Sequence, residues 1–165
     1  MKKIVLFITA LMMTVAAQAQ FEQGKAYLGA TLSGLDLSYN GMQKGRFILG
    51  GKVGYLFADD WMLSAQLGYE KQKDEPYRMS LGAGVRYYIV QNGLYLGASG
   101  IFKHAHEYND FLPSVQLGYA FFLSRTVTIE PEFYYEQSFK SHSDYSTVGF
   151  RIGVGVYLFK DKTKN

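Results

Sequence analysis

The chain has 165 residues, a net charge of +3 and no cysteine. The lack of cysteine excludes disulfide frameworks, thiolate metal sites, thiol catalysis and a lipidated lipoprotein anchor. The small charge gives no reason to expect a nucleic-acid partner. Glycine (18 residues) and aromatic residues (16%) are abundant, whereas proline (3 residues) is scarce. This composition favours strands over helices and over low-complexity loops.

Residues 1–19 have the features of a cleaved secretory signal. Two lysines follow the initiator methionine, an apolar core comes next, and Ala17–Gln18–Ala19 matches an A-x-A cleavage site. The apolar core is too short for a membrane anchor, and Gln, Phe and Glu follow it instead of a basic cluster. We therefore expect residues 1–19 to be removed and residues 20–165 to form one domain.

Apolar and polar residues alternate with a period of two through most of this domain. In 61–70, for example, Trp, Leu, Ala, Leu and Tyr alternate with Met, Ser, Gln, Gly and Glu. Such alternation predicts strands with one apolar face. Eight segments follow the pattern: 25–39, 47–57, 61–70, 78–89, 94–103, 114–123, 127–136 and 148–159.

The first segment changes parity part-way. Leu28 and Leu32 fall on one face, whereas Leu35 and Leu37 fall on the other. One extra residue would reconcile the two halves, so we predict a β-bulge near Ser33–Gly34 that turns Asp36 to the polar face.

The connections alternate between short and long. The short ones are 58–60, 90–93 and 124–126, and the longer, more polar ones are 40–45, 71–77, 104–110 and 138–144. Short turns at one end and longer loops at the other are typical of outer-membrane barrels. Spanning strands take about 9–11 residues each, so the chain can hold eight but not sixteen. The predicted fold is all-β: an eight-stranded antiparallel up-and-down transmembrane β-barrel.

The main alternative fold is a soluble secreted barrel of the lipocalin type, with its apolar face inside. The apolar rows carry large side chains at most positions, which would overfill an eight-stranded interior. The other face is rich in glycine, which leaves room inside a barrel for long charged side chains. We predict that this face forms an ionic network that plugs the lumen: Lys52, Glu70, Arg78, Arg86, Lys103, Glu130, Glu132, Glu136 and Arg151.

Aromatic residues gather near the strand ends. Two girdles at the membrane interfaces are expected of a transmembrane barrel. The predicted girdle near the short turns comprises Tyr55, Phe57, Trp61, Tyr87, Phe121 and Phe159, and the one near the longer loops includes Tyr69, Phe102, Phe133 and Tyr135.

The signal, the eight amphipathic strands and the glycine-alternating last segment resemble the small outer-membrane β-barrel family that includes OmpX and the OmpA membrane domain. Arg151-x-Gly153-x-x-Val156-x-Leu158 resembles the signal that barrel-assembly machinery reads in a final strand. The tail 160–165 departs from the family, many members of which stop at the aromatic. The resemblance implies insertion in the outer membrane of a Gram-negative bacterium.

Some small outer-membrane barrels modify lipid A, so an enzyme is the alternative function. The stretch Phe102–His106 resembles the strand-borne histidine of lipid A deacylases, which carry a serine nucleophile two residues later. Here that position is His106, so the pattern lacks its nucleophile. His104 and His106 with Glu107 or Asp110 could also bind a metal, but a solvated loop is the simpler interpretation.

We therefore predict a plugged, non-catalytic barrel, monomeric and without a cofactor or metal. Its expected partners are outer-membrane lipid and lipopolysaccharide, and the barrel-assembly machinery during insertion. An extracellular ligand could bind through loops 40–45, 71–77, 104–110 and 138–144.

Overall fold

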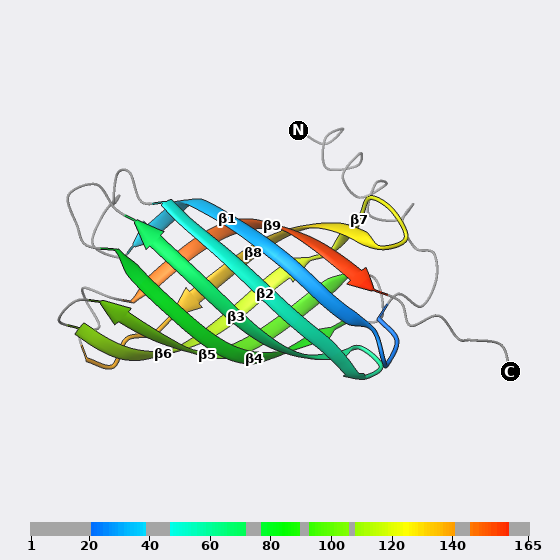
Figure 1. Cartoon of the computed structure of the whole chain (residues 1–165), viewed down its shortest axis with the longest axis horizontal. Coiled ribbons are helices and arrows are strands. Elements are labelled where there is room, and N and C mark those ends of the chain that lie inside the picture. The colour runs from blue at the N-terminus through cyan, green and yellow to red at the C-terminus, as the bar shows by residue number, and fades with distance from the viewer. Residues whose placement is uncertain are drawn as a thin grey trace, which may run out of the picture.

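The structure, a computed structural model, describes residues 21–38, 47–71, 77–89, 93–105, 108–140 and 146–158. All regular structure in these ranges is β (Figure 1). The strands are β1 (Ala26–Ser38), β2 (Phe47–Ala58), β3 (Trp61–Lys71), β4 (Arg78–Tyr88), β5 (Leu94–Ala105), β6 (Tyr108–Tyr119), β7 (Phe121–Phe122), β8 (Val127–Glu136) and β9 (Thr147–Leu158). No helix within these ranges is long and apolar enough to cross a membrane.

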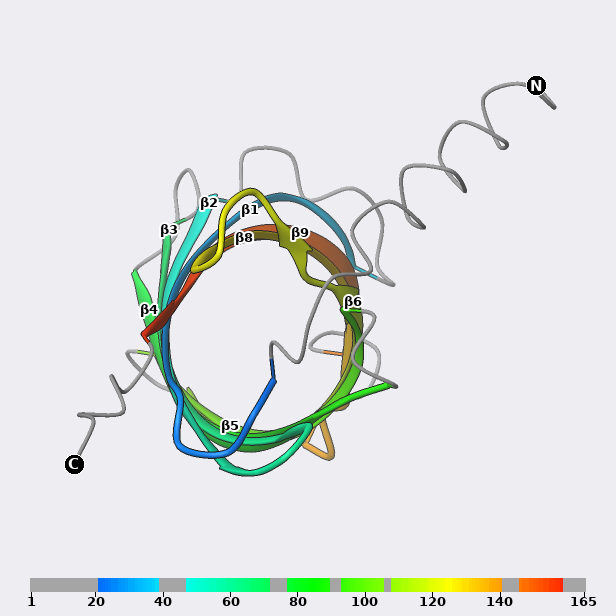
Figure 2. The same cartoon turned by 90° about the vertical axis from the view of Figure 1, so that its right-hand side faces the viewer.

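The strands form one closed antiparallel sheet. Consecutive strands pair from β1 to β6 and from β7 to β9, and β6 pairs with β8. Strand β1 also pairs with β9, which joins the first strand to the last. Viewed from one end, the strands make a closed ring (Figure 2). Strand β7 continues β6 in an unchanged register against β8, beyond a break at Ala120. The barrel therefore has eight spanning strands, as predicted.

The two faces of the sheet differ sharply in exposure. Leu67 and Leu81 on the outer face are 63% and 57% exposed, whereas Arg86 and Glu132 on the inner face are each 3% exposed. A soluble barrel would bury the leucines and expose the charges. The observed arrangement instead presents apolar side chains to a lipid surround.

The bulge predicted in the first strand is confirmed. The pairing of β1 with β9 shifts between Leu32 and Leu35, which places the extra residue at Ser33–Gly34. The side chain of Asp36 lies outside the described residues. A second irregularity, between Leu56 and Ala58 in β2, was not predicted.

The prediction of a loop over 104–110 was wrong. Strand β5 runs to Ala105 and β6 begins at Tyr108, and the pairing continues through His104↔Asn109 and Lys103↔Asp110. The polar composition suggested a loop. However, the alternation continues, with Asp110 buried in the lumen and Phe111 exposed outside.

Two glycines make room for tyrosine rings inside the barrel. A Cβ at Gly118 would lie 2.4 Å from the Tyr95 hydroxyl, and one at Gly29 would lie 2.4 Å from the Tyr27 hydroxyl. A larger residue at either position would displace a ring, so these glycines allow β1 and β5 to place aromatic groups in the lumen.

Candidate functional site: the barrel lumen

The middle of the lumen holds a compact ionic cluster. Arg86 on β4 donates through Nη1 to Oε2 of Glu130 at 2.8 Å and through Nη2 to Oε2 of Glu132 at 3.1 Å. Arg151 on β9 donates through Nε to Oε1 of Glu132 at 2.6 Å. The ammonium of Lys52 lies 3.8 Å from Oε2 of Glu132. Glu132 thus contacts three cations, which offsets the cost of burying their charges.

Tyrosines complete this cluster. Tyr27 donates its hydroxyl to Glu130 and Tyr95 donates its hydroxyl to Glu132, each at 2.9 Å. The Arg86 guanidinium lies 3.8 Å from the centroid of the Tyr95 ring, a cation–π contact in a buried setting. The carboxylates are therefore held from several strands at once, which gives the cluster a defined geometry.

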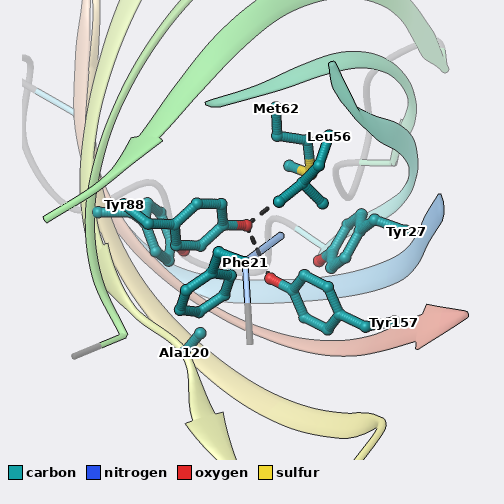
Figure 3. Packing of buried hydrophobic residues seen from close by; sticks show 8 residues of the cluster. Phe21, Tyr27, Leu56, Met62, Tyr88, Ala120 and Tyr157 are labelled. Carbon is teal, nitrogen blue, oxygen red and sulfur yellow. Dashed lines mark hydrogen bonds between the residues drawn. The ribbon is translucent and has the colours of Figure 1, made fainter. Parts of the chain in front are cut away.

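The end of the lumen near the short turns is filled by an aromatic plug, defined here as Phe21, Tyr27, Leu56, Met62, Tyr88, Tyr95, Ala120 and Tyr157. Phe21 is fully buried and stacks on Tyr88 with centroids 3.7 Å apart. The Tyr88 hydroxyl lies 2.7 Å from that of Tyr157 and donates to the Met62 sulfur (Figure 3). Side chains from several strands thus pack against one another inside this end of the barrel.

The segment before β1 runs from the barrel wall into the mouth, as the blue trace in Figure 2 shows. Its residue Phe21 is fully buried. The amide of Asp60 donates to the Phe21 carbonyl at 2.8 Å, and the Gly24 amide donates to the Leu56 carbonyl at 2.8 Å. The Gln23 amide donates to Oδ1 of Asp59 at 2.9 Å. These bonds hold the segment against the β2–β3 turn, so the plug includes residues from outside the strands.

Asp60 occupies an unusual position in that turn. Its φ of 63° is left-handed, a conformation that Asp tolerates better than most residues. Partial burial, and then the neighbouring charge of Asp59, raise the pKa of the Asp60 carboxyl above its usual range. The turn is therefore a source of pH dependence outside the membrane-spanning strands.

The opposite half of the lumen is polar and contains a cavity of about 60 Å³. On one wall Arg78 lies 3.5 Å from Glu70, and on another Lys103 donates to Glu136 at 2.5 Å. Lys52 and Arg151 of the ionic cluster line the same cavity. The lumen therefore has an aromatic end, an ionic middle and a polar end that contains the cavity.

All nine residues predicted for the ionic network line the lumen, and the structure sorts them into three groups. Five meet in the central cluster, whereas the Glu70–Arg78 and Lys103–Glu136 pairs stand apart toward the longer loops.

Most of the predicted girdle residues are exposed on the outer face: Tyr55, Phe57, Trp61, Tyr87, Tyr69, Phe102 and Phe133. Phe121 and Tyr135 are partly exposed. Phe159 lies outside the described residues.

Sequence reasoning missed the aromatic plug. Tyr88, Tyr95 and Tyr157 fall on the polar parity near short turns, a repeated feature that could have suggested aromatic packing in the lumen. Phe21 precedes the first strand, where no periodicity indicates its direction.

The two candidate histidines lie near the longer loops. His104 is exposed, and its Nδ1 lies 2.5 Å from Oδ1 of Asn109. His106 lies outside the described residues.

The sequence matches the family described as outer membrane protein beta-barrel domain over residues 5–163. The chain belongs to this family. It is accordingly an integral outer-membrane barrel protein of a Gram-negative bacterium. A comparison with curated proteins found no match.

Solved structures share the fold at low sequence identity. The N-terminal β-barrel domain of Pseudomonas aeruginosa OprF gives a TM-score of 0.62 at 14% identity, covering 82% of this chain and 98% of that one. Yersinia pestis Ail in a phospholipid nanodisc gives 0.56 at 14% identity, with 82% and 100% covered. Neisserial surface protein A gives 0.53 at 17% identity, with 81% and 96% covered. At these identities the likeness concerns the fold alone.

Proposed function

We propose that this outer-membrane protein is a closed, non-catalytic barrel that acts through its surface. The observation that carries the proposal is the double obstruction of the lumen. The aromatic plug fills one end, and the Arg86–Glu130–Glu132–Arg151 cluster crosses the middle. A solute would have to displace both.

The two obstructions resist opening for different reasons. The plug is apolar and close-packed, so opening it would expose aromatic surface to water. The ionic cluster is polar, but separating Arg86 from its carboxylates would leave buried charges without partners. Neither layer offers a pathway that a small side-chain rotation would open. A structural or binding role fits this interior better than transport.

The surroundings of His104 support the non-catalytic part of the proposal. A hydrolase of the deacylase type needs a nucleophile within hydrogen-bond reach of its base. The ring of His104 instead contacts an amide side chain, that of Asn109. The position two residues after His104 is a second histidine. The alternative function, lipid A modification, would require a nucleophile from elsewhere or a metal-activated water.

Lipopolysaccharide is the partner that the outer surface fits best. Short turns face the periplasm in this class of barrel, so the opposite rim meets the outer leaflet. Tyr69 and Tyr77 are exposed near that rim, with ring centroids 6.2 Å apart and nearly parallel. Lys71 and His104 are exposed close by. Aromatic rings and cations suit an interface of sugars and phosphates.

Other partners follow from the remaining surface. The β9 residues Arg151, Gly153, Val156 and Leu158 resemble the signal recognised by barrel-assembly machinery, which supports insertion by that route. The predicted ligand-binding loop 104–110 is largely strand. It therefore offers less loop surface to a ligand than was expected. The other segments predicted to bind an extracellular ligand, 40–45, 71–77 and 138–144, lie wholly or largely outside the described residues.

Mass spectrometry of lipid A and adhesion measurements test this proposal together. Cells overproducing the protein should have unchanged lipid A, and His104→Ala should make no difference. Cells with and without the protein should differ in binding to surfaces coated with protein, glycan or lipopolysaccharide, and loop replacements should remove that difference. An acyl chain lost or gained from lipid A only with intact His104 would establish an enzyme instead.

A further inference from the structure

The cavity in the polar half of the lumen has a cationic floor. Lys52 and Arg151 form this floor. Behind them, Arg86, Glu130 and Glu132 complete the ionic cluster, which therefore holds three cations and two carboxylates. Because this excess positive charge is buried among strands, water screens it poorly. The floor therefore favours a negatively charged occupant.

The walls do not cancel this excess. Glu70 is held by Arg78 and Glu136 is held by Lys103, so each wall pair is close to neutral. Asp110 accepts a hydrogen bond from Ser138 at 2.5 Å and does not line the cavity. The carboxylates nearest the floor are thus already engaged with cations.

Lys52 is the residue that most needs a further partner. It is 6% exposed, and within the described residues its one ion pair is the 3.8 Å contact with Glu132. That distance is too long for a hydrogen bond, while an ammonium group has three N–H donors. A buried charge with unused donors is costly unless something polar approaches it. The cavity beside Lys52 is the place from which that group can come.

Glycines keep the space open. A Cβ at Gly50 would lie 2.4 Å from Oγ1 of Thr31, and one at Gly68 would lie 2.3 Å from Oγ of Ser80. Both glycines and both hydroxyls line the cavity. A single water needs about 10–15 Å³ of such space, so about 60 Å³ admits a small ion with a few waters. The hydroxyls add donors suited to an anion.

We propose that this cavity is a binding site for one small inorganic anion of halide size, held between Lys52 and Arg151. The anion would take up the unused donors of Lys52 and offset the excess charge of the floor. The wall pairs Glu70–Arg78 and Lys103–Glu136 line the same cavity. The site goes beyond the proposed closed-barrel function and does not depend on a surface partner.

Bromide is the direct probe. Purified barrel, refolded in a nonionic detergent, should broaden the bromide-81 NMR line beyond a detergent blank, and chloride should compete the broadening away. Lys52→Met should abolish the excess broadening, whereas Arg125→Met, which removes an exposed cation in the turn before β8, should preserve it. Retained heat-modifiable mobility on gels would show that each variant is folded. Equal broadening by wild type and Lys52→Met would overturn the proposal.

Wild-type crystals soaked in bromide provide a second measurement that requires no variant. The expected result is an anomalous peak inside the cavity, in contact with Nζ of Lys52 and the guanidinium of Arg151. A cavity that contains only water at high bromide would overturn the proposal, because water alone would then satisfy the Lys52 donors.

Discussion

Arg86 and Glu130 meet across the lumen from β4 and β8, two strands that do not pair in the sheet. Their charged atoms lie 2.8 Å apart, and each side chain is 3% exposed. Strands β5 and β6 lie between β4 and β8 in the sheet, so the contact forms only when the sheet curves round and brings the two strands to face each other across the lumen. The contact therefore links the stability of the fold to the ionic cluster in the lumen.

Arg86→Met should strongly destabilise the barrel. The change leaves Glu130 without its guanidinium partner and removes one of the three cations around Glu132. Breaking a buried pair from one side typically costs about 3–5 kcal/mol. Urea unfolding in lipid vesicles measures the loss, and Arg125→Met in an exposed turn is the matched control. Similar unfolding free energies for the two variants would show that the cluster is not held by these ion pairs.

Leu81→Arg should impair membrane insertion more than Ser80→Arg. Leu81 is 57% exposed on the outer face, whereas Ser80 lines the polar cavity. An arginine in the lipid region costs about 2–4 kcal/mol near the bilayer centre. Refolding yield into vesicles gives the comparison. Equal yields, or a lower yield for Ser80→Arg, would mean that the two faces have been assigned the wrong way round.

Phe21→Ala should loosen the aromatic plug and admit water to it. Loss of a buried phenylalanine typically costs about 3–5 kcal/mol, and here it removes the stack on Tyr88. The chain has no cysteine, so Met62→Cys introduces a unique thiol inside the plug. A soluble thiol reagent should label that thiol much faster in the Phe21→Ala background. Phe121→Ala, at an outer-face position, should leave the labelling slow.

Fast labelling of Met62→Cys with Phe21 intact would contradict this account. It would show that the segment before β1 does not seal the mouth.

Asp60→Asn should alter the pH dependence of stability. The folded-state pKa of Asp60 is raised by burial and by Asp59, so folding favours its protonated form. The stability that this protonated form contributes is fully present below about pH 3.9, the ordinary pKa of an aspartate side chain. That stability is lost as the pH rises through the folded-state pKa. Asparagine tolerates the left-handed φ and has no charge. The variant should therefore lose less stability than wild type between pH 3 and pH 7.

Unfolding measured at both pH values checks this expectation, and Asp60→Ala serves as the backbone control because it should be strained at either pH. A larger loss of stability in Asp60→Asn than in wild type would contradict the sign of the effect.

Strand alternation predicted most of the fold because side-chain direction in a strand has a period of two. Once Leu81 faces lipid, Arg86 must face the lumen, and a single inserted residue at Ser33–Gly34 explains the one change of parity. The hairpin near Asp110 was missed because its polar residues match the composition of a loop. Only the pairing with β5 shows that they continue the sheet.

Contacts across the lumen were beyond prediction for a geometric reason. Alternation shows that Arg86 and Glu130 point inward, but their relative heights depend on the tilt and stagger of the closed barrel. The same applies to Tyr88 and Tyr157, whose hydroxyls meet from β4 and β9. The position of Phe21 could not be predicted from alternation either, because Phe21 precedes the strands. Its position depends on hydrogen bonds to the β2–β3 turn.

Planar-bilayer recording of the refolded wild-type protein tests the closed lumen most directly. The aromatic plug and the Arg86–Glu130 cluster predict no sustained conductance over the background of the membrane. Steady, reproducible conductance steps from wild-type protein would contradict the account, because they would require an open route past both obstructions.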